Sequence, residues 1–332
     1  MKRPWLTPLI PLYAAGVALR SMALRVGLER QRRLRWPVVS VGSLSAGGAG
    51  KTPVVQALVR MLTAQGVHVD VLSRGYGRAS AETLAVDPEG NAQRFGDEPL
   101  LLARTTGVPV YVGSARWHAG CLAEERQASS HSMHLLDDGM QHRQLHRTLD
   151  IALLSREDLQ DALLPAGNRR ESLRALRRAD LLAVHEDDAD AQAWIRTHLP
   201  QHAVWTYTRS MQWPEDIPRQ VFAFCGIARS DQFLNGLRAG GLEIVGERIF
   251  GDHHSYRDSE LQELALAIRK SGAAAFITTE KDRVRLGEQV KILERIAPCH
   301  AADVVVRFTD PAAVLERLLG LLPDESIKAV QG

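Results

Sequence analysis

A glycine-rich segment that ends in Lys-Thr contains the residues best suited to phosphate chemistry. It follows an apolar run typical of a strand and precedes a run with helical spacing. Glycines let backbone N–H groups turn toward phosphate oxygens, and the helix N-terminus adds partial positive charge. Lys51 would reach the outer phosphates, and the Thr52 hydroxyl would coordinate Mg²⁺. The segment predicts a phosphate-binding P-loop formed by Ser45, Ala46, Gly47, Gly48, Ala49, Gly50, Lys51 and Thr52.

This P-loop departs from the usual pattern at its first position, where Ser45 stands in place of glycine. The alternative is a glycine-rich turn that binds nothing. Gly47, Gly48 and Gly50 keep the loop free to curl, and a Gly-Lys-Thr between a strand and a helix favours the phosphate-binding interpretation.

Two adjacent carboxylates supply the acidic group that a P-loop enzyme needs for its metal. Asp137 and Asp138 follow the apolar residues 133–136 and precede Gly139. At the carboxyl end of a parallel strand they would lie beside the P-loop and organise Mg²⁺. Asp-Asp-Gly is also a common turn sequence, so without the P-loop the motif would be weak.

A dense group of hydrogen-bonding and cationic side chains follows at residues 141–147. It includes Gln141, His142 and Arg143. Such donors could stabilise charge on a phosphoryl group in transfer. An exposed polar loop is the alternative.

The order of predicted elements indicates an α/β fold. Strands alternate with helices, which predicts right-handed βαβ units and a mostly parallel, P-loop NTPase-like sheet with helices on both faces. Prolines and a looser pattern around residues 205–220 mark a boundary, so we expect a P-loop core domain at 37–212 and a smaller second α/β domain at 213–332. Expected strands are 37–42, 67–72, 108–112, 133–136, 149–154, 181–184, 221–224, 242–245, 274–277 and 304–308; expected helices are 51–65, 98–105, 115–127, 173–178, 232–239, 261–268 and 312–321.

The N-terminal segment, residues 1–36, is apolar and basic. Its apolar run from Trp5 to Leu19 contains Pro8 and Pro11 and is short for a bilayer span. Eight Lys and Arg residues against one Glu would face anionic headgroups, so we expect an interfacial helix. A helix packed on the protein's own core, with a solvated basic end, is the alternative.

Composition adds few constraints. The 332 residues carry a formal net charge of +2, which gives no reason to expect a nucleic-acid partner. The three cysteines, Cys121, Cys225 and Cys299, lack the spacing of a zinc site and suit a reducing compartment.

Seven motifs in order resemble the tetraacyldisaccharide 4'-kinase family of Gram-negative bacteria. Together they are far more specific than a bare P-loop, and the resemblance covers about residues 10–320. They are V-G-S-L-S-A-G-G-A-G-K-T-P (41–53), L-S-R-G-Y-G-R (72–78), G-D-E-P (96–99), D-D-G-M-Q-H-R (137–143), L-P-A-G-N-R-R-E (164–171), D-H-H-S-Y (252–256) and T-T-E-K-D (278–282).

The resemblance implies transfer of the ATP γ-phosphate to the 4'-hydroxyl of tetraacyldisaccharide 1-phosphate, a lipid A precursor. It implies catalytic roles for Lys51 and Asp138, and for Asp97 as a carboxylate partnered by a histidine of the second domain. His253 and His254 are both candidates, with a preference for His254. A base in one domain and its partner in the other would meet only when the domains close.

We expect a substrate-binding set, and a solvated surface side chain is the alternative for each of its arginines. Arginines suit bidentate contact with the substrate's phosphate or the transferring group. The expected set comprises Arg74, Glu98, Arg116, Gln141, His142, Asn168, Arg169 and Glu171, with Arg78 and Arg170 as further phosphate ligands. For Glu280, Lys281 and Asp282 we expect an ion-pair network at the interdomain cleft and no chemical role.

An acylated substrate lies in a bilayer, which predicts a place at the cytoplasmic face of the inner membrane without an obligate protein partner. Two other functions stay open: a membrane-surface P-loop ATPase without a lipid acceptor, and a membrane-binding module with a vestigial P-loop. The absence of an N-K-x-D-type signature disfavours a GTPase, and intact Lys51, Thr52 and Asp138 disfavour the vestigial module.

Overall fold

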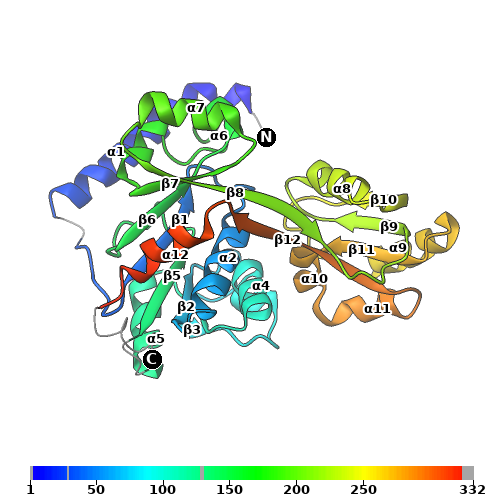
Figure 1. The fold of residues 1–332 in the computed structure, drawn as a ribbon. Coiled ribbons are helices and arrows are strands. Elements are labelled where there is room, and N and C mark those ends of the chain that lie inside the picture. The colour runs from blue at the N-terminus through cyan, green and yellow to red at the C-terminus, as the bar shows by residue number, and fades with distance from the viewer. Residues whose placement is uncertain (1–2, 28–29, 128–130, 324–332) are drawn as a thin grey trace.

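A computed structural model describes residues 3–27, 30–127 and 131–323. One sheet of 12 strands runs through the molecule in the order β10-β9-β11-β12-β8-β7-β6-β1-β5-β2-β4-β3. Figure 1 shows two lobes joined by the long strands β8 (Ala203–Gln212) and β12 (Cys299–Phe308). The expected α/β class, with a mostly parallel sheet, is confirmed.

The first lobe is a parallel sheet with helices on both faces, apart from the antiparallel edge strand β3. Alternation along β1 sends Val39 and Val41 into the core beneath α2 and α4, whereas Val38 faces the core beneath α5. The strands are β1 (Val38–Ser43), β2 (His68–Ser73), β3 (Leu84–Ala85), β4 (Val110–Val112), β5 (Ser132–Asp137), β6 (Leu149–Leu153) and β7 (Leu181–His185). The helices are α2 (Lys51–Thr63), α3 (Ala92–Phe95), α4 (Asp97–Thr106), α5 (Arg116–Arg126), α6 (Arg156–Gln160), the 3-10 helix η2 (Leu173–Arg178) and α7 (Ala189–His198).

The second lobe continues the same sheet with three parallel strands. Its two cores lie on opposite faces, one built around Phe224 and Phe276 and the other around Phe233 and Leu237. The strands are β9 (Gln220–Cys225), β10 (Glu243–Ile249) and β11 (Ala275–Thr279). The helices are α8 (Ser230–Ala239), α9 (Asp258–Ser271), α10 (Glu280–Leu286), the 3-10 helix η3 (Gly287–Gln289) and α11 (Val290–Glu294).

The connection between the lobes differs from the expectation in two ways. The first part of the expected boundary region, from residue 205, belongs to strand β8. This strand pairs antiparallel with β12 from Tyr207 to Gln212. Helix α12 (Pro311–Leu319) then returns to the first lobe, where Val314 and Leu318 are buried in its core. The expected 213–332 domain therefore does not hold for α12, and the chain crosses between the lobes twice.

The N-terminal segment forms the 3-10 helix η1 (Pro4–Leu9) and helix α1 (Ile10–Arg25). Pro4–Leu24 is long and apolar enough to cross a membrane by length and composition alone, and none of its hydrophobic window is buried. Trp5, Leu12 and Leu19 are 76%, 73% and 70% exposed. The helix touches the first lobe through the Tyr13 hydroxyl, which donates to the carbonyl oxygen of Arg170 at 3.0 Å.

Candidate active site

The P-loop lies between β1 and α2, as the sequence predicts. Gly48 and Gly50 have φ angles of +70° and +76°, a left-handed conformation that side chains rarely adopt. Gly50 immediately precedes the first turn of α2, so the P-loop ends at a helix N-terminus, where backbone N–H groups are free to bind an anion. The Ser45 hydroxyl donates to buried Asp158, and the Ala46 N–H donates to the Asn168 carbonyl oxygen at 2.9 Å.

Buried Lys51 forms an ion pair with the half-buried Asp138 next to this loop. The Lys51 Nζ lies 3.4 Å from Asp138 Oδ1 and 3.2 Å from the Ser43 hydroxyl. Arg170 holds the same carboxylate with two hydrogen bonds of 2.6 and 2.7 Å. Burial would raise the pKa of Asp138, but Lys51 and Arg170 lower it to about 2. Asp138 is therefore ionised and already paired.

Asp137, at the end of β5, is in the opposite situation. Both of its carboxylate oxygens are buried and have no hydrogen-bond partner. Burial, with the charges of Glu98 and Asp138, raises its pKa to about 7. A buried carboxylate without donors fits a cation, and Thr52 is buried in the first turn of the adjacent α2. Within the described ranges, no three His, Cys, Asp or Glu side chains could hold a metal alone, but Mg²⁺ in kinases also takes phosphate ligands.

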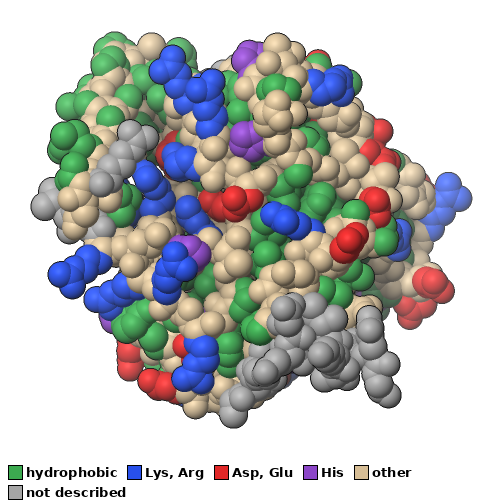
Figure 2. Space-filling model, turned by 60° about the vertical axis from the view of Figure 1, so that its left-hand side comes forward, with side chains coloured by type: hydrophobic (Ala, Val, Ile, Leu, Met, Phe, Trp, Pro, Cys, Tyr) green, Lys and Arg blue, Asp and Glu red, His purple; other side chains and the backbone are tan. Residues whose placement is uncertain are grey.

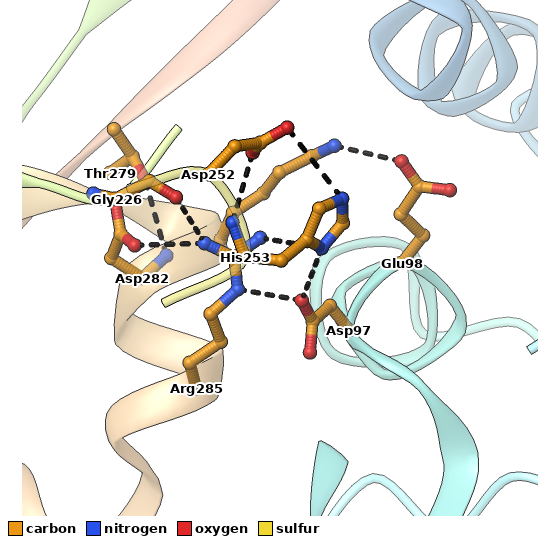
Figure 3. A network of polar contacts seen from close by, with 9 residues as sticks. Asp97, Glu98, Gly226, Asp252, His253, Thr279, Asp282 and Arg285 are labelled. Atoms are coloured by element: carbon orange, nitrogen blue, oxygen red, sulfur yellow. Dashed lines mark hydrogen bonds and ion pairs between the residues drawn. The ribbon is translucent and has the colours of Figure 1, made fainter. Parts of the chain in front are cut away.

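Asp97 meets the second lobe at the N-terminus of α4 (Figure 3). Its Oδ2 lies 3.2 Å from His253 Nδ1 and accepts a 2.6 Å hydrogen bond from Arg285 Nε. Burial would raise the pKa of Asp97, but His253 and Arg285 outweigh it and hold the pKa below its usual value. The hydrogen bond to Asp97 in turn raises the pKa of His253.

The preference for His254 as the partner of Asp97 is wrong. His254 Nε2 lies 2.9 Å from Glu260 Oε2, within the second lobe, and its ring stacks on Phe250. The backbone of His253 has a φ of +57°, which turns successive side chains in different directions. Adjacent histidines therefore serve different contacts, and no property of the two residues alone distinguishes them.

Glu98 extends the contact between the lobes. Its Oε1 lies 2.8 Å from Lys281 Nζ of α10, so Lys281 does form the interlobe ion pair expected for residues 280–282. Burial would raise the pKa of Glu98, but Lys281 lowers it. Lys281 and Arg285 are four residues apart on one face of α10. They form ion pairs with Glu98 and Asp97, the two acidic residues that begin α4. The lobes are already in contact here, and Asp97 already meets His253, although we expected that pair to meet only on closure.

Arg116 and His142 form the buried basic part of the site. Arg116 Nη1 lies 3.4 Å from His142 Nδ1. Burial and the nearby charge of Arg74 lower the pKa of Arg116 to about 10, and burial with Arg116 lowers the pKa of His142 to about 3. His142 is therefore neutral and available for hydrogen bonding, whereas Arg74 is exposed. These positions suit contact with an anionic substrate.

The remaining expected substrate ligands bind one another and the P-loop. The Gln141 amide donates to the Ser43 carbonyl oxygen at 3.1 Å and to Glu171 at 3.2 Å. Arg169 bridges to Ser45 through backbone pairing, and Asn168 accepts from Ala46. Arg78 and Arg169 each retain a buried guanidinium nitrogen without an acceptor. Residues 168–171 thus support the P-loop from the side.

Two arginines that the sequence analysis missed lie against the P-loop. Arg209 on β8 donates to the Ala49 carbonyl oxygen at 3.1 Å and to the Tyr207 hydroxyl at 2.7 Å. Arg229, just before α8, approaches Gly48 so closely that a Cβ there would lie 2.9 Å from its Nε. Together with Ala49 and Tyr207 they line a cavity of about 390 Å³. No local motif marks either arginine.

Comparison with known proteins decides the family. A family model described as tetraacyldisaccharide-1-P 4'-kinase matches residues 2–323. The chain belongs to this family.

Relatives named tetraacyldisaccharide 4'-kinase agree over nearly full length. One from Koribacter versatilis is 40% identical, and the matched region covers 96% of this chain and 98% of that relative. Another from Geobacter metallireducens is 36% identical over 90% and 92% of the two chains. The crystal structure titled "apo" form LpxK from Aquifex aeolicus in complex with ATP is similar, with a TM-score of 0.78, 31% identity and coverage of 97% and 99%.

Membership of the tetraacyldisaccharide-1-phosphate 4'-kinase family confirms three expectations from the sequence. They are the family resemblance, the enzyme class of kinase and the place in lipid A biosynthesis. The ATP complex of the similar structure also supports ATP as the nucleotide.

Proposed function

We propose that this chain transfers the γ-phosphate of ATP to the 4'-hydroxyl of tetraacyldisaccharide 1-phosphate. The observation that carries the proposal is the juxtaposition, across two lobes, of Asp97 with His253 beside a P-loop lysine. Glu98, which follows Asp97 on α4, is close enough to Lys51 and Asp138 for their charges to affect its pKa. The first turn of α4, which begins with Asp97, therefore lies next to the nucleotide site.

The protein side chains would position the reactants and move one proton. The 45–52 backbone and Lys51 would hold the ATP phosphates, and Arg209 and Arg229 would close the nucleotide cavity from the second-lobe side. Ionised Asp97, oriented by His253 and Arg285, would accept the proton of the attacking hydroxyl. Arg116 and neutral His142 would hold anionic or hydroxyl groups of the acceptor.

Mg²⁺ would be held by Asp137 and Thr52. The buried, partnerless oxygens of Asp137 fit that role, whereas those of Asp138 are taken by Lys51 and Arg170. When bound, the ion would neutralise charge on the ATP phosphates. Asp138 would then act mainly by fixing Lys51, and would join the metal site only if Arg170 released it.

The exposed apolar side chains of η1 and α1 support a place at the membrane surface. An acylated acceptor lies in a bilayer, and these side chains present a surface to lipid on the lobe that carries the P-loop. We propose that the enzyme works at the cytoplasmic face of the inner membrane, bound by this segment and without an obligate protein partner.

The test is transfer of label from γ-labelled ATP to tetraacyldisaccharide 1-phosphate in mixed micelles with Mg²⁺, comparing the wild type with Lys51→Ala. Labelled bisphosphorylated lipid that is lost in the variant is the expected result. ATP hydrolysis that depends on Lys51 without lipid transfer would favour the other candidate, a P-loop ATPase without a lipid acceptor.

A further inference from the structure

Arg229 of the second lobe lies against the P-loop of the first lobe. A Cβ on Gly48 would be 2.9 Å from Arg229 Nε and 3.6 Å from its Cζ, so the guanidinium fills the space beside this glycine. In P-loop enzymes the backbone of this loop holds the β- and γ-phosphates of the nucleotide. The Arg229 guanidinium therefore lies beside the place where those phosphates would bind.

The guanidinium of Arg229 has no partner in this position. Lys51 pairs with Asp138 nearby, and Arg209 donates to a carbonyl oxygen of the P-loop. Glu157 lines the same cavity as Arg229. Among the residues that the structure describes, however, no carboxylate or carbonyl oxygen accepts a hydrogen bond from the Arg229 side chain. A guanidinium without an acceptor is ready to bind an anion.

Position, rather than charge alone, distinguishes Arg229 from the arginines of the open surface. Figure 2 shows Lys and Arg side chains gathered on one face of the molecule, next to apolar surface and around a small group of carboxylates. Water and salt screen charges on such a face. Arg229 is half-buried and lines, with Ala49 of the P-loop, the cavity of about 390 Å³. Its charge would therefore act more strongly on a phosphate bound there.

The segment that carries Arg229 also positions the proposed proton acceptor. Gly226, which begins this segment, accepts hydrogen bonds at its carbonyl oxygen from Arg285 Nη1 at 2.6 Å and from the His253 N–H at 3.2 Å. Arg285 and His253 are the residues that hold Asp97. One short loop of the second lobe thus places a cation at the nucleotide and supports the two partners of Asp97.

We propose that Arg229 is a catalytic residue that contacts the β- and γ-phosphates of ATP and stabilises the charge of phosphoryl transfer. During transfer the bond from the γ-phosphorus to the ADP oxygen breaks, a bond to the acceptor's 4'-hydroxyl oxygen forms, and the hydroxyl proton passes to Asp97. Negative charge grows on the oxygen that leaves with ADP. A guanidinium beside the P-loop can bind that oxygen and a γ-phosphate oxygen together.

The role of Arg229 rests on the proposed function, because it belongs to the same reaction. It also makes the reaction depend on contact between the lobes, since the cation comes from the second lobe and the P-loop from the first.

The test compares Arg229→Gln and Arg229→Lys in the full chain. Arg238→Gln is the matched control, because Arg238 lies on the adjoining helix α8, is 50% exposed and pairs with Glu247 at the surface. Thermal unfolding would verify that all three variants fold. One arm measures, by calorimetry without lipid, the affinity for ADP and for the non-hydrolysable β,γ-imido analogue of ATP. The other measures kcat and KM for phosphate transfer in mixed micelles.

Arg229→Gln should lower kcat by about 100-fold or more, because an arginine that acts on a transferring phosphoryl group contributes about a thousandfold or more in other P-loop enzymes. It should weaken the ATP analogue about tenfold and ADP less, with the KM for the lipid unchanged. A fall in kcat alone would show that the contact forms only in the transition state. Arg229→Lys should recover affinity but little of kcat, since an ammonium group lacks the bidentate fork.

A kcat of Arg229→Gln equal to that of the Arg238→Gln control would overturn the proposal. Equal weakening of both nucleotides would also overturn it, because Arg229 would then contact a part that ATP and ADP share. Failure of the proposed function gives a different result, since the wild type itself would transfer no phosphate to the lipid. The calorimetric arm would still test Arg229 in that case.

Discussion

Individual side chains in the site acquire their roles from the groups that surround them. Asp137 and Asp138 are adjacent in sequence, but burial without donors raises the pKa of one, whereas two cations lower the pKa of the other. His253 and His254 divide in the same way between Asp97 and Glu260.

The contact between Asp97 and His253 predicts that the two residues act as a unit. We expect His253→Ala to lower kcat by about 100-fold or more, as removal of a positioned proton-transfer group commonly does. His254→Ala, which removes a contact within the second lobe, serves as the control and should cost far less. Steady-state kinetics with saturating ATP would measure both.

Asp97→Asn should resemble His253→Ala, with ATP affinity near that of the wild type, and the double variant should lose little more than either single one. A larger loss from His254→Ala, or additive losses in the double variant, would contradict the pairing.

Asp137→Asn should weaken the response to Mg²⁺ while leaving the fold intact. The amide keeps the shape of a side chain whose oxygens have no partner in the structure, but removes the charge that would attract the cation. We expect the Mg²⁺ concentration for half-maximal activity to rise about tenfold or more. An unchanged Mg²⁺ dependence in a kinetic titration would remove Asp137 from the metal site.

Among the elements, β2, β5 and α5 share a buried polar cluster away from the catalytic site. His134 Nδ1 lies 2.7 Å from Asp70 Oδ1, and its Nε2 lies 3.4 Å from Glu124 Oε1. Glu124 also accepts hydrogen bonds from the backbone N–H groups of Arg35 and Trp36, and Trp36 stacks on His134. The cluster therefore fixes the segment that leads from α1 into β1.

This cluster predicts a pH-dependent stability. Burial would lower the pKa of His134, but Asp70 and Glu124 raise it from 6.5 to about 9. The stabilisation is therefore fully present below about pH 6.5 and is lost as the pH rises through about 9, with an upper limit of about 3 kcal/mol. Urea unfolding from pH 6 to pH 10 would measure it.

His134→Gln should flatten that part of the profile, whereas His68→Gln, on the half-buried start of β2, should leave it in place. A wild-type free energy of unfolding that did not decline across this range would show that His134 is not charged in the folded state.

On the scale of the whole molecule, two lobes share one sheet and α1 stands beside the first. Strands β8 and β12 cross between the lobes. The ion pairs between α10 and α4 form a second connection at the site. The nucleotide cavity and Asp97 thus both depend on residues from the two lobes.

The exposure of α1 predicts that its apolar residues bind lipid. The double variant Leu12→Ser with Leu19→Ser should reduce binding to vesicles by about tenfold or more. The reason is that binding would no longer transfer two exposed leucine side chains from water into lipid. The loss should change little with salt, unlike loss of the basic residues. Vesicle sedimentation at two ionic strengths would measure it.

Leu266→Ser, at a residue 58% exposed on α9, is the matched control and should bind as the wild type does. Equal binding by the α1 double variant and this control would contradict the membrane role of α1.

The sequence by itself determined the P-loop, the α/β order and the family, because those features are local. Glycines, Lys51 and Thr52 must be contiguous to wrap a phosphate, and apolar periodicity marks buried strands and helices directly. Strand β8 escaped prediction because it is partly exposed and bounded by prolines, so its pattern resembles a linker. The tertiary structure alone decided which histidine meets Asp97, that α12 returns to the first lobe, and that Arg209 and Arg285 reach the site. Such contacts join residues far apart in the chain, and their geometry depends on how the elements pack rather than on local propensity.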